Sequence, residues 1–350
     1  MNKIKILLYS HDIDYGGTWR SHENIIKHLD KDIFESYVMY WDKNESNNRL
    51  PVSKEILKDT IFVPFERTYE RKKDHYAPDA TNFTKIARDI GLDIIHFARS
   101  GYSEWPFDRR LAKLQVETNI FGDSDPTGFL DKSICISNYV SNIRGRSDAV
   151  IYNPVPGEMD VEGLREDLGI AEDAIVLGRI GRYDNPHYIA IKSFEKILKD
   201  HANTYYIIIC GHHLIKEYVL KNKIPNVIFI EETNDDTYIG RFYKTIDIFA
   251  HYRSDGETHG IAIAQAMMNG VPVISHESVV HNGHIETIGD SGRVVGCEDE
   301  SGYVRFIKEM IEDETYRIKL GDMAKKLAEE RYGEKDICKK YQDCYLEWLK

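Results

Sequence analysis

Cysteine is scarce in this sequence, and long apolar runs are absent from it. Only five of the 350 residues are cysteines, and no two of them have the C-x-x-C spacing of a redox or zinc site. Scattered thiols of this kind are typical of a reducing compartment. No window reaches the roughly 18 apolar residues of a membrane span, and the apolar run near the N-terminus is too short for a signal peptide. We therefore expect a cytoplasmic protein with at most peripheral membrane contact.

Basic residues are outnumbered by acidic ones. The chain has 46 lysines and arginines against 58 aspartates and glutamates, which gives a formal net charge of −12. Because nucleic-acid binding requires a basic surface, this balance argues against a nucleic-acid partner. No metal site is predicted, since His281 and His284 lack a matching cluster of cysteines or carboxylates. The two D-x-D tripeptides, which begin at Asp12 and Asp123, are interpreted as solvated loop acids.

What the sequence does contain is a regular alternation of strand and helix patterns. Short β-branched or aromatic runs, such as residues 4–10, 175–180 and 204–210, alternate with longer amphipathic segments. Several of these runs are continuously apolar, which is typical of parallel strands covered on both faces. Strands that alternate with helices indicate βαβ units. The length suggests about two domains, so we predict an α/β protein with two Rossmann-like, doubly wound parallel-sheet domains that face a cleft.

A segment with two prolines and little periodicity, residues 153–164 (NPVPGEMDVEGL), separates the two series of predicted strands. We therefore predict an N-terminal domain over residues 1–153 and a C-terminal domain over residues 154–333. A C-terminal helix over residues 334–350 is expected to pack back on the first domain. In open α/β sheets, ligands bind outside the carboxyl ends of the strands, so the functional residues are expected in the loops that follow strands.

Two such loops carry residues suited to phosphate binding. Gly16 and Gly17 lie between the first predicted strand and a helix, where glycines let the backbone approach a ligand and the helix N-terminus attracts an anion. A tight turn would explain the same pair. Arg182 follows the first strand of the second domain, and its guanidinium could hold a diphosphate through two hydrogen bonds. A surface arginine explains that position equally well.

The segment over residues 251–275 is the most informative. Within HGIAIAQAMM, residues 259–268, the only polar side chains are His259 and Gln265. A helix that is apolar all round is buried, so Gln265 needs a hydrogen-bond partner from the protein or from a ligand hydroxyl. Glu257 stands just before the helix N-terminus, where its carboxylate could cap the helix or accept hydrogen bonds from a sugar. A cap together with a satisfied core amide is the simpler interpretation.

Taken together, these loops resemble the GT-B fold glycosyltransferases, most closely the large retaining family 4. The signature of that family is E-G-F-G, a second Glu eight positions after the first, and then A-M-x-x-G-x-P-V-I. Here the corresponding residues are ETHG from Glu257, then Gln265, then AMMNGVPVI. The run SDAVIYNPV (147–155) resembles the family's domain hinge, and HIETIGDSGRVV (284–295) resembles its E-x-I-x-x-G-x-x-G segment. The likeness therefore extends over nearly the whole chain.

The resemblance implies a role for each matching residue. Glu257 and Arg182 would be the catalytic residues. Glu257 would contact the donor sugar ring, and Arg182 would neutralise the leaving diphosphate, where electrostatic stabilisation acts most strongly. Arg182 and the helix N-terminus would do the work of the divalent cation of GT-A enzymes, so no metal or other cofactor is expected. The residues that would bind the donor are Gly16, Gly17, Thr258, His259, Gly260, Ile261 and Gln265, with Gln265 in place of the glutamate that binds the ribose.

Several positions depart from the pattern of the family. Gln265 replaces the second Glu of the signature. The family has a G-R pair after the first strand of its second domain, which Gly181-Arg182 matches here. The lysine that often follows that arginine is absent, and Asn185 or His187 stands near its place. The second histidine of the family's H-x-H motif is Ala98 here. One phosphate-binding charge and one active-site imidazole are therefore expected to be missing.

The residues expected on the acceptor side are His96, Arg99, Glu117 and Asn119. His96 matches the first histidine of the H-x-H motif, and Arg99 follows shortly after it. Glu117 and Asn119 end a predicted strand, although a buried structural polar network explains these two equally well. The basic and aromatic stretch at 66–76 is interpreted as a solvated loop; in this family such a face can touch an anionic membrane.

We therefore predict a metal-independent, retaining glycosyltransferase that moves a hexose from a nucleotide-diphosphate sugar to a glycan or a small hydroxylated acceptor. Two alternatives stay open. One is a catalytically silent GT-B protein that binds a sugar nucleotide or a glycan, which the changes at Ala98 and Gln265 motivate. The other is a GT-B sugar-nucleotide epimerase. The sequence does not indicate the donor sugar, the base, the acceptor or the oligomeric state.

Overall fold

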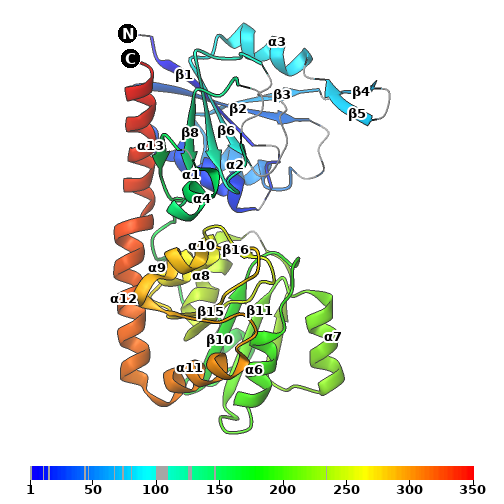
Figure 1. Ribbon diagram of the computed structural model, residues 1–350, viewed down its shortest axis with the longest axis vertical. Helices are drawn as coiled ribbons and strands as arrows, with labels where there is room; N and C mark the ends of the chain where they lie inside the picture. Colours follow the sequence, from blue (N-terminus) through cyan, green and yellow to red (C-terminus); the bar gives the residue numbers. More distant parts are fainter. Residues whose placement is uncertain are drawn as a thin grey trace. The chain divides into compact units, whose positions relative to one another are not determined.

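The computed structural model describes residues 2–10, 12–14, 16–42, 45, 47–66, 68–72, 75–79, 81–99, 109–124, 128–145, 147–233 and 235–350, with the backbone alone for 68–72, 75–79 and 99. The chain forms two compact units (Figure 1). The N-terminal unit comprises Met1–Pro154 together with Glu334–Lys350, and the C-terminal unit comprises Val155–Gly333.

The N-terminal unit is built on a parallel sheet with the strand order β3-β2-β1-β6-β7-β8-β9. The order reverses at β1, which lies between β2 and β6. The strands are β1 (Ile4–Tyr9), β2 (Phe34–Trp41), β3 (Ile61–Phe65), β6 (Ile94–Arg99), β7 (Leu114–Asn119), β8 (Lys132–Cys135) and β9 (Ala149–Val150). The helices are α1 (Gly17–His28), α2 (Leu50–Ile56), α3 (Thr81–Ile90), α4 (Asn138–Arg144) and α13 (Glu334–Trp348).

Both faces of this sheet are covered by helices. Ile6, Leu7 and Leu8 of β1 are fully buried. Ile6 and Leu8 belong to a core cluster shared with α1 and α13, whereas Leu7 belongs to a second cluster shared with α3. Because successive side chains of a strand point to opposite faces, a strand buried on both sides needs a continuous apolar run. This requirement explains the unbroken apolar sequence of the first strand.

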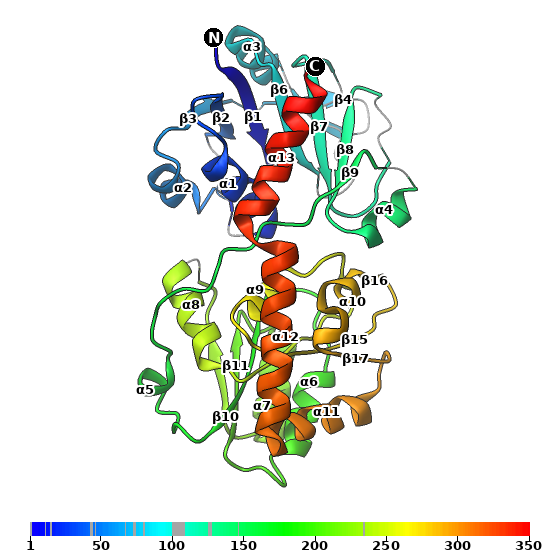
Figure 2. The same ribbon diagram turned by 90° about the vertical axis from the view of Figure 1, so that its left-hand side faces the viewer.

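The C-terminal helix α13 packs on the N-terminal unit, along α1 (Figure 2). Its buried residues are Ile337, Cys338, Tyr341 and Tyr345. Their spacing of three or four residues places them on one face of the helix. This face contributes two tyrosine rings to the core beneath α1.

The C-terminal unit contains a second parallel sheet with the order β12-β11-β10-β13-β15-β17. Its strands are β10 (Ile175–Ile180), β11 (Thr204–Ile209), β12 (Val227–Ile230), β13 (Ile248–Ala250), β15 (Val273–His276) and β17 (Arg293–Val295), and a separate short pair is β14 (Gly256–Glu257) with β16 (His281–Asn282). The helices are α5 (Arg165–Leu168), α6 (Ile189–Ile197), α7 (His213–Asn222), α8 (Asp236–Thr245), α9 (Ile261–Met268), α10 (Gly283–Ile288), α11 (Glu300–Glu312) and α12 (Glu314–Tyr332), and a 3-10 turn spans Gly289–Ser291.

Helices cover this sheet too. Phe194 of α6 and Tyr303 of α11 pack with Tyr206 of β11 in one core cluster. The long helix α12 packs against α9. At Gly321 of α12 the backbones come so close that an added Cβ would lie 2.2 Å from the carbonyl oxygen of Gly270. The helix α9 is therefore held by close packing against α12.

The predicted fold class, α/β with two parallel-sheet domains, is confirmed by these two sheets. One local prediction was wrong: the stretch at 66–76, interpreted as a loop, contains parts of an antiparallel pair, β4 (Thr68–Lys72) with β5 (His75–Asp79). Among the described residues, no helix combines the length and the apolar character needed to cross a membrane.

Candidate functional site

The short pair β14–β16 holds Glu257 in the loops that follow β13 and β15. Gly256 pairs with His281, and Glu257 pairs with Asn282. The backbone of Gly256 has a φ of +68°, and an added Cβ would lie 1.8 Å from the carbonyl oxygen of His281. Only glycine fits this position. Glu257 is thus fixed beyond the carboxyl ends of the strands, where open α/β sheets bind their ligands.

The Glu257 carboxylate is one-third exposed and faces two nitrogen-bearing side chains. Its Oε1 lies 3.8 Å from Nε2 of His251 and 4.0 Å from Nε of Arg253. His251 is buried, and its Nδ1 lies 2.8 Å from Oγ of Ser275. Burial holds the pKa of His251 well below its ordinary value, so the imidazole is neutral at physiological pH. The carboxylate is therefore oriented from the protein side while one edge stays open to a ligand.

Arg253 links the loop after β13 to the loop after β10. Its guanidinium lies 2.9 Å from Oδ1 of Asp184 and 2.6 Å from Oδ1 of Asp255. Asn185 donates a hydrogen bond of 2.8 Å to Asp255. Burial lowers the pKa of Arg253, but the carboxylates of Glu257, Asp255 and Asp184 outweigh burial and raise it. These ion pairs join the predicted phosphate loop to the Glu257 loop as one polar network.

The N-terminus of α9 follows directly. Gly260 adopts a left-handed backbone with a φ of +88° and precedes Ile261, the first helical residue. No side chain of the described residues caps this helix end, and its first turn contains no acidic residue. The leading N–H groups of a helix have no partners within the helix. Together with the helix dipole, they can bind an anionic group such as a phosphate.

Thr258 and His259, which precede this helix, are both buried. The His259 ring meets the Tyr332 ring edge-on at 5.2 Å, and burial lowers the pKa of His259 to about 4. Gly283 lets α10 approach closely, because an added Cβ there would lie 2.1 Å from the carbonyl oxygen of Thr258. The side chains at 258 and 259 therefore anchor the loop, which leaves its backbone to meet a ligand.

Gln265 lies one turn further along α9 and is only half-buried. Its Oε1 accepts a hydrogen bond of 3.3 Å from Oη of Tyr243, which also donates to the carbonyl oxygen of Ala262 at 3.1 Å. The partner of this amide in the protein is thus a tyrosine of α8. The predicted contact of Gln265 with a ribose stays a prediction.

Arg182 is exposed in the loop after β10, and a buried arginine lies beneath it. Arg179 of β10 is 3% exposed and donates to the carbonyl oxygens of Gly181, at 3.2 Å, and of Arg182, at 2.9 Å. Its guanidinium also lies 4.6 Å from the ring centroid of Tyr252. Sequence reasoning missed both Arg179 and Arg253. The signal for Arg179 was present, since a charged residue interrupts the buried strand IVLGRI.

In the N-terminal unit, Gly16 and Gly17 begin α1 after β1. Gly16 has an extended backbone, and its N–H donates to Oδ1 of Asp14 at 2.9 Å. No side chain of the described residues caps α1, and its first turn has no acidic residue. This helix end is therefore a second candidate for anion binding in the chain. Asp14 acts as a turn-forming acid there, whereas Asp125 of the other D-x-D tripeptide lies outside the described residues.

His96, predicted on the acceptor side, is fully buried in the N-terminal unit. Its Nδ1 lies 2.5 Å from Oη of Tyr345, and its Nε2 lies 2.8 Å from Oγ1 of Thr118. Burial holds the pKa of His96 well below its ordinary value. Both ring nitrogens are therefore used within the unit, in a contact that anchors α13. Arg99 ends β6 with its backbone described and its side chain outside the described part of the chain.

Glu117 and Asn119 lie in a buried polar network at the end of β7. Glu117 is fully buried, pairs with Arg144 at 2.5 Å and accepts a hydrogen bond of 2.8 Å from Ser133. Asn119 donates to the carbonyl oxygen of Asp123 at 2.7 Å. These contacts hold the loop after β7 and agree with the alternative interpretation of the pair as structural. A contact of either residue with an acceptor stays a prediction.

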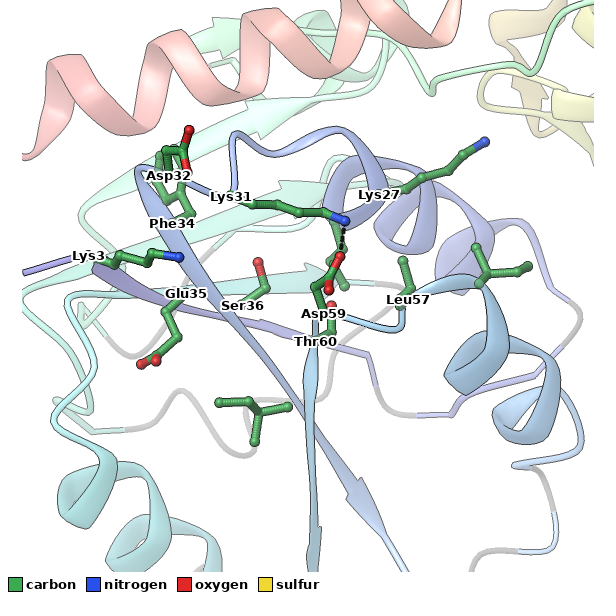
Figure 3. Close-up of a pocket in the computed structure, with 13 residues that line it drawn as sticks. Lys3, Lys27, Lys31, Asp32, Phe34, Glu35, Ser36, Leu57, Asp59 and Thr60 are labelled. Carbon is green, nitrogen blue, oxygen red and sulfur yellow. Dashed lines mark hydrogen bonds and ion pairs between the residues drawn. The ribbon is translucent and has the colours of Figure 1, made fainter.

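Two cavities lie away from Glu257. One, of about 330 Å³, is lined by Lys3, Lys27, Lys31, Ser36, Asp59 and Thr60 among others (Figure 3). It lies at the amino ends of β2 and β3, whereas ligands of open α/β sheets bind at the carboxyl ends. The other, of about 170 Å³, lies at the start of α6 around His187 and Lys192. Across the described residues, no group of three or more histidines, cysteines or carboxylates is arranged to hold a metal ion.

Some known proteins are similar in sequence to part of this chain, and others are similar to its overall fold. Residues 161–327 match the family described as Glycosyl transferases group 1. The capsular polysaccharide biosynthesis glycosyltransferase CapM of Staphylococcus aureus is 26% identical over 190 residues. That match covers 52% of this chain and 48% of CapM, so the chain spans about half the length of this curated relative.

Two solved structures resemble the chain over nearly its full length. A glycosyltransferase from Rickettsia africae has a TM-score of 0.77 and 16% identity, with 100% of both chains covered. HepE of Anabaena, solved in complex with UDP and glucose, has a TM-score of 0.75 and 14% identity, with 97% of this chain and 99% of HepE covered. At these identities the likeness shows the fold, which is the GT-B arrangement of two Rossmann-like domains within one chain.

Proposed function

We propose that this protein is a retaining glycosyltransferase of the family 4 type, because residues 161–327 match the family described as Glycosyl transferases group 1. It transfers a hexose from a nucleotide-diphosphate sugar to a glycan or a small hydroxylated acceptor. The observation that carries the proposal is the N-terminus of α9, which no described side chain caps and which lies a few residues after Glu257. A helix end suited to phosphate and a carboxylate suited to sugar hydroxyls thus stand a few residues apart.

In this proposal the C-terminal domain binds the donor. The diphosphate meets the N–H groups at the start of α9 and the Arg182 side chain, and Glu257 accepts hydrogen bonds from the hexose. Gln265 contacts the ribose while Tyr243 supports it. HepE was solved with UDP and glucose, which supports a donor of this class. The N-terminal domain contributes Gly16 and Gly17 to the diphosphate and the loops after its strands to the acceptor.

The reaction breaks the bond between the anomeric carbon and the diphosphate oxygen and forms a bond from the same carbon to the acceptor oxygen. The acceptor hydroxyl proton passes to the departing diphosphate, and attack occurs on the face that the diphosphate leaves. Negative charge grows on the diphosphate, so fixed donors and cations around it lower the barrier. We propose that Arg182 and the α9 dipole do this without a divalent cation. CapM is named for capsular polysaccharide biosynthesis, which supports a glycan as the acceptor.

A donor screen tests the proposal. UDP-, GDP- and ADP-sugars are incubated with the protein and a broad acceptor panel, with and without EDTA, while nucleotide release and glycosylated products are measured. We expect release from one donor, unaffected by EDTA, and a product that keeps the anomeric configuration. Loss of the activity in EDTA would contradict metal independence, and an inverted product would contradict retention.

A catalytically silent binding protein is the second candidate. The departures from the family pattern at Ala98 and Gln265 motivate it. Binding of a sugar nucleotide without any release, over all donors and acceptors, would support this reading. Conversion of a free sugar nucleotide to its epimer would instead support an epimerase.

A further inference from the structure

Arg179 is a buried cation for which the described residues provide no anionic partner. The side chain is 3% exposed, and it forms no ion pair with any carboxylate among the residues that the structure describes. Arginine stays protonated at all physiological pH values. Its Nε has no hydrogen-bond partner among the described residues, and the same holds for Oη of the buried Tyr252 beside it. The C-terminal unit therefore contains a buried positive charge that no carboxylate of the described part of the chain neutralises.

The chain contains a useful contrast in Arg49. That arginine is 1% exposed, but it is paired with the buried carboxylate of Glu23 at 2.7 Å. Buried charges in proteins are ordinarily paired in this way, because leaving water is costly unless an opposite charge compensates. Arg179 instead has two carbonyl oxygens and an aromatic face. Dipoles and rings stabilise a guanidinium, but they carry no net charge to balance it.

The contacts of Arg179 shape the loop after β10. Both terminal nitrogens of the guanidinium donate to consecutive carbonyl oxygens, those of Gly181 and Arg182. Since the C=O and N–H of a trans peptide point in opposite directions, the N–H of Arg182 is directed away from the guanidinium. A Cβ on Gly181 would lie 3.1 Å from Nη2 of Arg179, so this glycine also makes room for the charge. The backbone of the loop after β10 is therefore held by hydrogen bonds from the Arg179 guanidinium.

We propose that Arg179 is a positioning residue for the donor, and that the diphosphate held by the loop after β10 supplies its missing counter-charge. The proposal rests on the proposed function and adds a residue outside the motifs that resemble the family. Arg179 acts through the carbonyl oxygens it holds and through its field, which low-dielectric surroundings transmit further than water does. It thereby adds a positive charge that contacts the backbone of the loop in which the family's lysine is absent.

The test compares Arg179→Met with Arg179→Lys and the unaltered protein. Methionine keeps much of the volume and removes the charge, whereas lysine keeps the charge. Calorimetry measures the Kd of UDP, GDP, ADP and inorganic pyrophosphate, and saturation-transfer NMR measures the corresponding nucleosides. We expect Arg179→Met to raise the Kd of each diphosphate at least about tenfold, which corresponds to about 1.4 kcal/mol of binding free energy. The Kd of the nucleosides should stay unchanged. Arg179→Lys should recover most of the affinity. Arg305→Met, at an exposed position of α11, is the matched surface control.

Thermal unfolding of the ligand-free proteins separates this role from a structural one. Removing an uncompensated charge should leave the melting temperature of Arg179→Met equal to or above that of the unaltered protein, while the rise in melting temperature on adding diphosphate shrinks. Unchanged diphosphate affinity, or equal loss of diphosphate and nucleoside binding, would overturn the proposal while leaving the proposed function intact. If the unaltered protein binds none of the nucleotides nor pyrophosphate, the proposed function fails and this inference fails with it.

Discussion

Glu257 is the residue on which the proposed chemistry depends most directly. Its carboxylate is one-third exposed, and its inner side faces His251 and Arg253. A contact with the sugar that strengthens as the glycosidic bond breaks contributes to turnover more than to binding.

We expect Glu257→Ala to lower kcat by about 100-fold or more, in the range typical of lost transition-state contacts, and to change the Kd of the nucleoside diphosphate by less than about threefold. Steady-state kinetics and calorimetry measure the two effects separately. Glu231→Gln, at an exposed position after β12, is the control and should change neither. Full turnover in Glu257→Ala would remove the role assigned to Glu257.

Gln265 offers a test of the ribose contact. Tyr243 donates its hydroxyl hydrogen to Oε1 of Gln265, and a carboxylate would accept the same hydrogen bond. Gln265→Glu should therefore fold normally and bind the ribose hydroxyls more strongly, since charge-assisted hydrogen bonds are roughly twice as strong as neutral ones. We expect a severalfold lower Kd for the nucleoside diphosphate. The gain should vanish with the 2′-deoxynucleotide if the 2′-hydroxyl is the partner, or with the 3′-deoxynucleotide if the 3′-hydroxyl is. A gain that persists at full size with both analogues would contradict the contact.

At the scale of elements, the pair β14–β16 and the helix α9 together position the residues of the candidate site. The pair holds Glu257, and the helix begins at Ile261, four residues further on. Glycine at position 256 permits the pairing because its φ is positive and because no Cβ fits against the carbonyl oxygen of His281. Steric crowding and backbone strain act together there.

Comparison of Gly256→Ala with Gly169→Ala separates these two effects. Gly169 has a φ of +65° and no atom within 4 Å of an added Cβ, so its substitution reports backbone strain alone. We expect Gly169→Ala to cost about 1 kcal/mol and Gly256→Ala to cost at least about 2 kcal/mol more, because the pair must separate. Differential scanning calorimetry measures both. Gly256→Ala should also weaken diphosphate binding; equal costs for the two variants would show that β14–β16 tolerates the extra atom.

At the scale of the whole molecule, buried histidines dominate the expected pH response. Burial lowers the pKa of His22 and of His276 to about 3 and that of His259 to about 4, and it also lowers the pKa of His96, His251 and His284. The unfolded chain protonates these groups near pH 6.5. Below that pH the unfolded state binds more protons than the folded state. The contribution of these histidines to the free energy of unfolding is therefore fully present above pH 6.5, and it decreases as the pH falls toward 4.

His22→Leu tests this response in the N-terminal unit. His22 is buried beside His96, and neither of its ring nitrogens has a hydrogen-bond partner among the described residues. We expect similar stability at pH 7.5 and a smaller loss below pH 6.5, by about 1.4 kcal/mol per pH unit. The four tryptophans all belong to the N-terminal unit, so their fluorescence during urea unfolding follows it. His201→Leu, in the C-terminal unit, should leave that slope unchanged. An unaltered slope in His22→Leu would show that His22 is protonated in the folded state.

Local patterns were sufficient for the parallel strands of both sheets and for the resemblance to the glycosyltransferases, although they missed the pair β4–β5. Continuous apolar runs predicted parallel strands because a strand covered on both faces must be apolar at successive positions. The glycines and the Glu257 to Gln265 spacing predicted a strand-to-helix loop because backbone reach and helical periodicity act over a few residues.

Contacts between distant polar residues were decided only by the tertiary structure. His96 meets Tyr345 across 249 residues, and Glu117 meets Arg144 from a different element. The charge of Arg179 was visible as a break in an apolar strand, but neither its burial nor the lack of an anionic partner among the described residues could be read from that break. The sequence by itself determined which segments become strands and helices and where a phosphate loop can form, because those properties depend on near neighbours. Which buried charges are paired and which are left for a ligand depends on packing between elements, and a linear pattern does not contain that information.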